Sequence, residues 1–460
     1  MVNVAPEAVV DRFPYGKAPF WLTVVLLASV VLLAVARRER EPKPDLVFAI
    51  FAPNHVKSYE EVIAPFEKKH GVSVGLQLVH RAALQNRLQN AMLAGTPVPD
   101  MVEMLEGGLG FFTRGPLNDV GFLDLTERLE REGLRSRLVE SRLSLWTMRK
   151  RVLALPHDVH PTVLVYQPAL VESLGIDVSQ LKTWDDFVAV GQRISRDNDG
   201  DGVIDHFMID LPTSQAWGLI TLLRQRGIDL FDAEGHVGFN QPKTVDTIEW
   251  YLRQTVGPDK IAFECGWGQP LFKAMQDGLA LFFIAPDWRT HSFELDAPHL
   301  SGRFRAIPFP VWEPGGRRTS AWGGTGLAIA RATEHPELAW EFAKALYFDK
   351  DSLGKRFAET AILPPLKDAW DLPELKRPFE YYGGQRLGEL FAELATETPP
   401  AWGNPYSLMA ENKLSEAHVR SIEYYKQYGE KGLRAQIQRE LDAAEAYVRR
   451  VMDRNVLMKQ

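Results

Sequence analysis

Tryptophans beside glycine or proline are the residues of this chain best suited to specific recognition chemistry. The sequence contains twelve tryptophans in 460 residues. Trp288 closely follows a proline, and Trp322 precedes Gly323 and Gly324. An indole ring offers a flat apolar face, and in a glycine- or proline-rich loop that face is well placed to line a cleft. Combined with carboxylates and amides, such rings suit a carbohydrate, whose C–H faces stack on rings while its hydroxyls pair with polar groups.

The remaining tryptophans divide between cleft and core. Trp217 and Trp267 leave both interpretations open. Trp184, Trp250 and Trp340 fit the apolar faces of helices, so we expect them to pack inside the protein.

A second pattern occurs at Asp197–Asp205, where acids alternate with other residues and a glycine stands at the sixth position. This pattern is typical of the first half of an EF-hand-type calcium loop. The expected ligands of a structural Ca²⁺ are Asp197, Asp199, Asp201, Val203 and Asp205. The twelfth position is Met208, so another acid would have to replace the usual glutamate. A solvated acidic turn is the alternative.

Other kinds of chemistry are disfavoured. The single cysteine, Cys265, excludes an internal disulfide and a cysteine-based zinc cluster. His157 and His160 could suggest a metal pair, but Pro161 follows and no third ligand is evident. The sequence has no nucleophile elbow, Walker loop or His-Glu-x-x-His motif, so we expect neither catalysis nor a cofactor required for function. A formal net charge of -7 without a long basic run argues against nucleic acid as a partner.

The N-terminus contains an uncharged apolar run from Phe20 to Ala36 with basic residues on both sides. Ala34–Ala36 fits the small-x-small pattern of a signal-peptide cleavage site. The run of about 17 residues is also at the short end for a membrane span. We therefore expect residues 1–44 to form a signal peptide or a membrane anchor, ending in a stiff spacer at Glu41–Pro44. Either reading places the remainder outside the cytoplasm, in the periplasm or another extracytoplasmic compartment.

Hydrophobic patterning predicts alternating strands and helices after this segment. The predicted elements are strands at 46–51, 72–79 and 99–104 and helices at 59–66 and 82–94. This alternation is typical of an α/β sheet covered by helices, and ligands lie beyond the carboxyl ends of such strands. Glu106 follows the third strand and should lie at that mouth. The length of the chain favours a second lobe, whose mixed pattern begins at Thr162.

From Leu46 onward the chain resembles the bacterial extracellular solute-binding proteins of the maltose-binding-protein type. The likeness lies in the order and spacing of six segments: Leu155–Asp158, Val163–Tyr166, Thr183–Phe187, Gly227–Pro242, Phe272–Trp288 and Ser320–Ile329. The resemblance implies an α/β protein with the two-lobed, type II periplasmic-binding-protein-like fold, preceded here by an N-terminal apolar helix. It also implies three crossings of the chain between the lobes.

The resemblance sets the expected domain boundaries. Lobe I is expected at residues 45–158 and 305–364, and lobe II, with C-terminal helices, at residues 159–304 and 365–460. The crossings are expected near His157–Pro161, Ser301–Ile307 and Ile362–Leu366.

The resemblance also adds candidate ligand contacts. Trp288 matches the position of a sugar-stacking tryptophan in the family, although Asp287 stands between it and the proline. Glu106 lies where the family places polar contacts, and Asp158 would lie at the first crossing, where it either binds ligand or caps a turn. The predicted ligand-contacting residues are Glu106, Asp158, Trp217, Trp267, Asp287, Trp288, Trp322, Gly323, Gly324, Asn404 and Tyr406.

Together these features predict the monomeric substrate-binding component of an ABC importer. It would capture a carbohydrate by hinge closure and deliver it to membrane permease subunits. Three alternatives stay open: a binder of another small solute, a membrane-anchored ligand sensor, and a carbohydrate-active enzyme.

Overall fold

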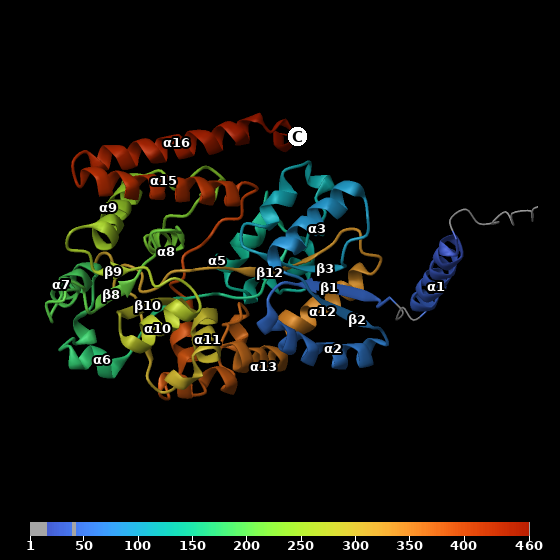
Figure 1. Cartoon of the computed structure of the whole chain (residues 1–460), viewed down its shortest axis with the longest axis horizontal. Helices are drawn as coiled ribbons and strands as arrows, with labels where there is room; N and C mark the ends of the chain where they lie inside the picture. Colours follow the sequence, from blue (N-terminus) through green and yellow to red (C-terminus); the bar gives the residue numbers. More distant parts are fainter. Residues whose placement is uncertain (1–15, 39–42, 460) are drawn as a thin grey trace, which may run out of the picture. The chain divides into compact units, whose positions relative to one another are not determined.

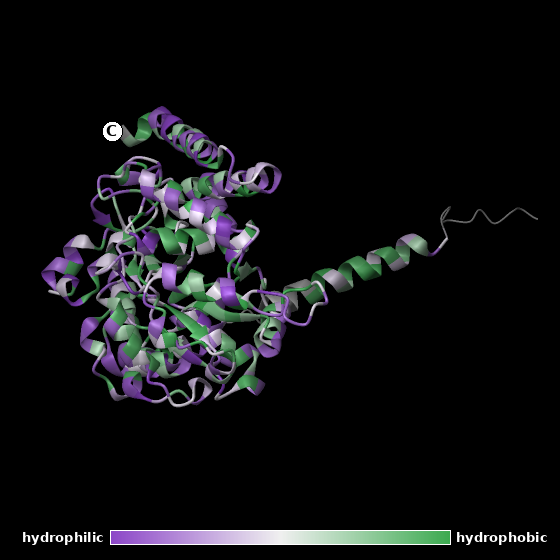
Figure 2. Ribbon diagram, turned by 90° about the vertical axis from the view of Figure 1, so that its left-hand side faces the viewer, coloured by the Kyte–Doolittle hydropathy of each residue, from purple (hydrophilic) through white to green (hydrophobic). Residues whose placement is uncertain are grey.

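The computed structural model describes residues 16–38 and 43–459 (Figure 1). The chain divides into an N-terminal unit that ends at Asp45 and a body that begins at Leu46. Helix α1 (Ala18–Arg38) contains the apolar run and is coloured mainly as hydrophobic in Figure 2. Across the described residues, no helix combines the length and hydropathy needed to cross a membrane. The predicted spacer at Glu41–Pro44 lies partly outside the described residues, and cleavage or retention of the run stays a prediction.

The first sheet of the body has the strand order β2-β1-β3-β12-β6. Its strands are β1 (Leu46–Ile50), β2 (Val74–Leu78), β3 (Met101–Leu105), β6 (Leu155–Pro156) and β12 (Thr325–Ile329). Strand β1 is parallel to β2 and β3, whereas β12 is antiparallel to β3 and β6. Helices α2 (Val56–His70) and α3 (Arg81–Ala94) connect the three parallel strands. The alternation predicted for residues 46–104 is confirmed.

The second sheet has the order β11-β7-β10-β8-β9. Its strands are β7 (Thr162–Tyr166), β8 (Phe207–Asp210), β9 (Ala262–Phe263), β10 (Ala280–Pro286) and β11 (Arg305–Ile307). The accompanying helices are α6 (Pro168–Ser173), α7 (Trp184–Ile194), α8 (Trp217–Gln225), α9 (Pro242–Val256), α10 (Gln269–Asp277) and α11 (Asp287–Asp296). Thr183 and Asp186 form a capping box that fixes the start of α7 where the sequence predicts it.

The assignment of residues 305–364 to the first lobe is wrong at its beginning. Strand β11 is antiparallel to β7, with Ala306 opposite Val165, so it belongs to the second sheet. After β11 the chain returns to the first sheet at Thr325. The second crossing therefore lies between β11 and β12, after the predicted interval Ser301–Ile307. A three-residue strand carries no local signal for its partner, because its pairing is decided by contacts distant in the sequence.

Each sheet carries a hydrophobic core on both faces. The other helices of the body are α4 (Thr126–Arg131), α5 (Glu140–Leu143), α12 (Pro336–Tyr347), α13 (Lys350–Thr360), α14 (Leu387–Ala395), α15 (Ser407–Tyr428) and α16 (Leu433–Arg454), and a short hairpin joins β4 (Thr147–Met148) to β5 (Arg151–Val152). Helices α2, α3 and α12 pack on the first sheet. Helices α8, α9, α15 and α16 cover one face of the second sheet, and α10, α11 and α14 cover the other (Figure 1). We refer to the two halves as the first and second lobe.

Three passages between the lobes follow from this packing. The chain leaves β6 at Pro156 and enters β7 at Thr162, passes again between β11 and β12, and passes a third time between α12 and α14. In addition, the segment 399–406 between α14 and α15 returns to the first lobe, where Ala401 is buried in its core. Residues 365–460 are thus not confined to the second lobe.

Candidate functional site

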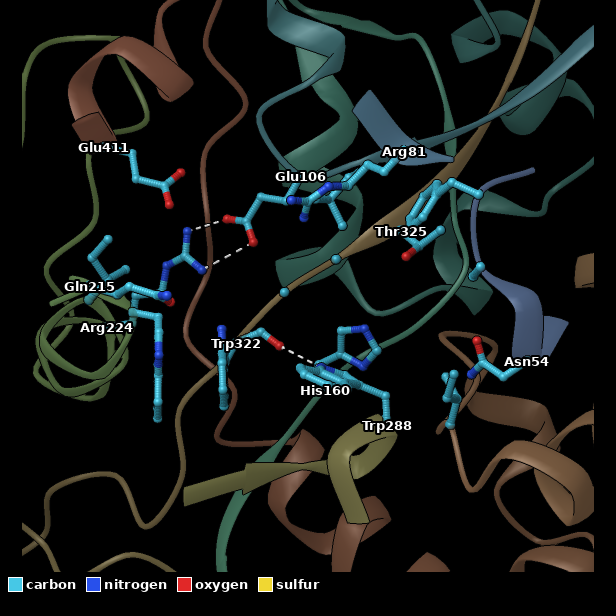
Figure 3. Close-up of a pocket in the computed structure, with 18 of the residues that line it drawn as sticks. Asn54, Arg81, Glu106, His160, Gln215, Arg224, Trp288, Trp322, Thr325 and Glu411 are labelled. Carbon is cyan, nitrogen blue, oxygen red and sulfur yellow. Dashed lines mark hydrogen bonds and ion pairs between the residues drawn. The ribbon is translucent and has the colours of Figure 1, made fainter. Parts of the chain in front are cut away.

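A cavity of about 470 Å³ lies where the ends of the two sheets face each other (Figure 3). The first lobe contributes residues that follow the carboxyl ends of β1 and β3, including Asn54, His55 and Glu106. The second lobe contributes residues of α8, of the loop after β9 and of the first turn of α11. The crossings add His160, Trp322 and Ile362. A cavity at the carboxyl ends of parallel strands is where an α/β sheet is expected to bind a ligand.

Four tryptophans from different elements meet at this cavity. Trp217 and Trp322 stack with their ring centroids 4.0 Å apart and their planes 3° apart. Trp288 stands edge-on to Trp322, with centroids 5.3 Å apart, and its indole N–H donates to the carbonyl oxygen of Trp322 at 3.3 Å. The ring centroid of Trp267 lies 6.0 Å from that of Trp217 and 5.8 Å from that of Trp322. The structure therefore brings together the tryptophans that the sequence singles out, including the two left undecided between cleft and core.

Helix α8 turns one face toward the cavity. Trp217, Ile220 and Arg224 follow helical spacing, so all three line the same wall. The Arg224 guanidinium forms an ion pair with Glu106 of the first lobe and donates through Nε to Asp229 at 3.1 Å. Burial alone would lower the pKa of Arg224, but Glu106 and Asp229 have the larger effect and raise this pKa above its usual value. The side chain therefore stays charged. The Glu106–Arg224 pair spans the cavity from one lobe to the other (Figure 3).

Several polar residues of the cavity are absent from the sequence prediction. They are Asn54, His55, Arg81, His160, Gln215, Arg224 and Glu411. Arg224 lies in an otherwise apolar helical stretch, and its spacing of seven residues from Trp217 is the signal that could have identified it. Shielding from water in the cleft raises the pKa of Glu411, and the nearby Glu106 adds to this effect.

The two glycines after Trp322 serve different purposes. Gly323 has a φ of 90°, which favours glycine, and a Cβ there would lie 3.4 Å from the Trp288 indole nitrogen. At Gly324 a Cβ would lie 2.6 Å from an Arg142 nitrogen, so this position is small because a protein side chain packs against it. Both glycines line the cavity, and their contact with a ligand stays a prediction.

Asp158 and Asp287 are fully buried and do not line the cavity, which corrects their predicted ligand contact. Both bind His160, whose Nε2 lies 3.0 Å from Asp158 and whose Nδ1 lies 2.5 Å from Asp287. Asp158 also accepts from the Thr325 amide at 2.7 Å, and Asp287 accepts from the Leu363 amide at 2.8 Å. These hydrogen bonds occupy the carboxylate oxygens that a ligand would need. The two acids instead join segments of all three crossings.

Asn404 and Tyr406 are also buried and do not line the cavity, which corrects their predicted ligand contact. The Asn404 side-chain oxygen accepts from the Tyr406 amide at 2.9 Å, and the Tyr406 ring lies 4.9 Å from the Arg114 guanidinium. The Tyr406 hydroxyl accepts from Asn455 at 2.8 Å. Because Arg114 belongs to the first lobe and Tyr406 is buried in the core of the second, these contacts join the segment 399–406 to both lobes.

Within residues 16–38 and 43–459, two groups of side chains have the composition of metal ligands. The carboxylates of Asp197, Asp199 and Asp201 converge within 4.8 Å of one another in the exposed loop predicted to hold calcium. His55, Glu103 and His157 converge in the interior. There the Tyr59 hydroxyl lies 3.1 Å from Glu103 and 2.9 Å from His157. Because that hydroxyl sits among the would-be ligand atoms, the interior group is a hydrogen-bond network.

Comparison with known proteins finds relatives over most of the body. A family model described as bacterial extracellular solute-binding protein matches residues 52–351. The arabinooligosaccharide-binding protein of Halalkalibacterium halodurans is 24% identical over 389 residues, which cover 82% of this chain and 84% of that protein. The arabinooligosaccharide-binding protein of Bacillus subtilis is 24% identical over 370 residues, which cover 78% of this chain and 83% of that protein.

Solved structures share the fold at low sequence identity. The sugar-binding protein MalE of Xanthomonas citri has a TM-score of 0.71 at 18% identity, covering 89% of this chain and 99% of its own. An ABC transporter associated binding protein from B. animalis subsp. lactis, in complex with β-1,6-galactobiose, has a TM-score of 0.68 at 19% identity, covering 88% and 97%. The predicted two-lobed α/β fold is confirmed.

The His160 bridge makes a prediction about pH. Burial alone would lower the pKa of His160, but Asp158 and Asp287 raise it from 6.5 to about 9. The native state therefore holds this proton more tightly than the unfolded chain, so the stabilisation is complete below pH 6.5 and is lost as the pH rises through 9. We expect the unfolding free energy of the wild type, measured by urea denaturation, to fall by roughly 2 to 3 kcal/mol from pH 6.5 to 9.

The variant His160→Gln is the control, because it retains polar hydrogen-bonding groups but cannot titrate. Its unfolding free energy should lack the part of the pH dependence that His160 supplies. An identical pH dependence in both proteins would contradict a protonated bridge.

Proposed function

The chain belongs to the bacterial extracellular solute-binding proteins, and from this premise we propose that it is the substrate-binding component of an ABC importer for a carbohydrate. It acts outside the cytoplasm as a monomer and delivers its ligand to permease subunits in the membrane. Export proceeds through the N-terminal apolar run, which is either cleaved or kept as a tether. The protein binds its ligand and performs no chemistry on it.

One observation carries the carbohydrate assignment: Trp217, Trp267, Trp288 and Trp322 converge on a cavity that also presents charged and amide groups. A sugar ring has apolar C–H faces that stack on indoles, and hydroxyl groups around its rim that pair with carboxylates, amides and guanidinium groups. The cavity offers both kinds of partner. Its position between two lobes supports capture by closure, in which the ligand favours the state that contacts it from both sides.

The named relatives guide the choice of ligands. Two bind arabinooligosaccharides by name, and one solved structure holds β-1,6-galactobiose. We therefore place short oligosaccharides first among the ligands of this chain.

A thermal-shift screen tests this function. Arabinotriose, maltotriose and β-1,6-galactobiose are compared with a peptide, a polyamine and a polyol phosphate. We expect at least one sugar to raise the melting temperature, because a ligand that binds only the folded state stabilises it. The carbohydrate assignment fails if no sugar has this effect while another solute does.

The variant Trp288→Ala tests the cavity as the ligand site. Loss of one stacking face should weaken the affinity for the sugar identified in the screen by about tenfold or more, as measured by titration calorimetry. Trp312→Ala is the matched control, because Trp312 is also partly buried and packs against other tryptophans but does not line the cavity. Equal affinity of Trp288→Ala and wild type would contradict the proposed site.

Calcium binding by the loop at Asp197–Asp205 stays a prediction, supported by the convergence of three of its carboxylates. Carboxylate oxygens suit this cation, whereas the twelfth position offers only the buried Met208. We expect CaCl₂ to raise the melting temperature relative to a chelator, and the double variant Asp199→Asn/Asp201→Asn to lose this shift while keeping sugar affinity. Equal melting temperatures of the wild type in CaCl₂ and in chelator would contradict the prediction.

A further inference from the structure

We infer that Arg289 is the positioning residue of the ligand site, holding Trp217, Trp267 and Trp322 in one aromatic platform from beneath the cavity. This role rests on the proposed function, because the platform is the surface on which the sugar would stack. Arg289 is 1% exposed and does not line the cavity, so its effect on a ligand passes through the rings.

The guanidinium of Arg289 is fixed at the ends of two central strands of the second sheet. One terminal nitrogen donates to the carbonyl oxygen of Ile284 in β10 at 2.7 Å. The other lies 3.5 Å from the carboxylate of Asp210, at the end of β8. Asp210 is itself held by the Cys265 amide, which donates to it at 3.0 Å. The cation therefore has a position set by the sheet rather than by the loops around the cavity.

The same guanidinium contacts three of the four cavity tryptophans. Its carbon lies 4.9 Å from the ring centroid of Trp267, 5.3 Å from that of Trp322 and 5.4 Å from that of Trp217. Since Trp217 and Trp322 stack at 4.0 Å, nearly equal distances to both place the guanidinium beside the stack, where it touches both rings. It thus abuts the stacked pair and Trp267 at once.

These rings come from separate parts of the chain. Trp217 begins α8, Trp267 lies in the loop before α10, and Trp322 lies in the second crossing. No single element can set their mutual positions, whereas one shared neighbour anchored to the sheet can. Trp267 is the most exposed of the three, with 45% of its surface open to solvent, so the contact with Arg289 lies on its buried side.

The guanidinium of Arg289 is buried with incomplete hydrogen bonding, and the rings fill the space around it. The Arg289 Nε is buried without a hydrogen-bond partner, and Asp210 at 3.5 Å offers only a long contact. Burial lowers the pKa of Arg289, and Asp210 opposes this shift. The rings pack around a guanidinium whose pairing is incomplete, so a change in their positions changes the surroundings of a buried charge. Ring placement and cation stability are therefore coupled.

The test compares Arg289→Met with Arg356→Met. Arg356 is a second buried arginine with an unpartnered Nε, and its ring contact is Tyr347, which does not line the cavity. Near-ultraviolet circular dichroism and tryptophan emission are recorded without ligand, and the affinity for arabinotriose is measured by calorimetry. We expect Arg289→Met to change both spectra and to weaken binding by roughly tenfold, with Arg289→Lys restoring part of each. Arg356→Met should keep the wild-type spectra and affinity.

The inference is overturned if Arg289→Met and Arg356→Met give the same spectra and the same affinity. If Arg289→Met does not fold, Arg289→Lys and Arg356→Lys are compared by the same criteria. If wild type binds neither arabinotriose nor the other sugars of the screen, the proposed function fails, and the spectra alone decide whether Arg289 orders the rings.

Discussion

A buried imidazole between two carboxylates is the interaction on which the relation of the two lobes depends. His160 bridges Asp158 and Asp287, and these acids also accept hydrogen bonds from the amides of Thr325 and Leu363. One cluster therefore joins segments of the three crossings, from Pro156 to Thr162, between β11 and β12, and between α12 and α14. Two carboxylates this deep would be costly to bury without a cation between them, and the protonated ring supplies it. The left-handed backbone of His160, with a φ of 58°, is held in place by the same contacts.

Across the cleft from this bridge, α8 makes contacts of the kind that a ligand would need. Trp217 covers one face of Trp322, and Arg224 binds Glu106 of the first lobe. A sugar that stacks on Trp322 or bonds to Glu106 competes with these protein contacts. The free energy of capture is then a difference between two sets of similar interactions, added to the cost of moving the lobes. This explains how a cavity can be strongly polar and aromatic and still release its ligand.

The fold follows from the sequence where local rules suffice. Alternating periods over residues 46–104 and the Thr183–Asp186 cap specify elements through contacts only a few residues apart. Local rules do not suffice for strand β11. Its pairing with β7 joins residues about 140 positions apart and depends on the whole second lobe. The return of segment 399–406 to the first lobe also has no local signal, because the Ala401 carbonyl oxygen accepts from the hydroxyl of Ser144, 257 positions away.

Sequence reasoning identifies the tryptophans and Glu106 of the candidate site and misses its other charged residues. An indole in a loop has few roles, whereas a loop carboxylate looks the same whether it meets a sugar hydroxyl or a buried imidazole. The first turn of α11 shows this difference at three neighbouring residues, Asp287, Trp288 and Arg289. Successive residues on a helix point about 100° apart, so these three side chains diverge to the hinge, the cavity and the space beneath the platform. A match to the family motif identifies Trp288 alone. Asp287 binds His160 between the lobes, and Arg289 contacts Trp322, the ring against which Trp288 packs.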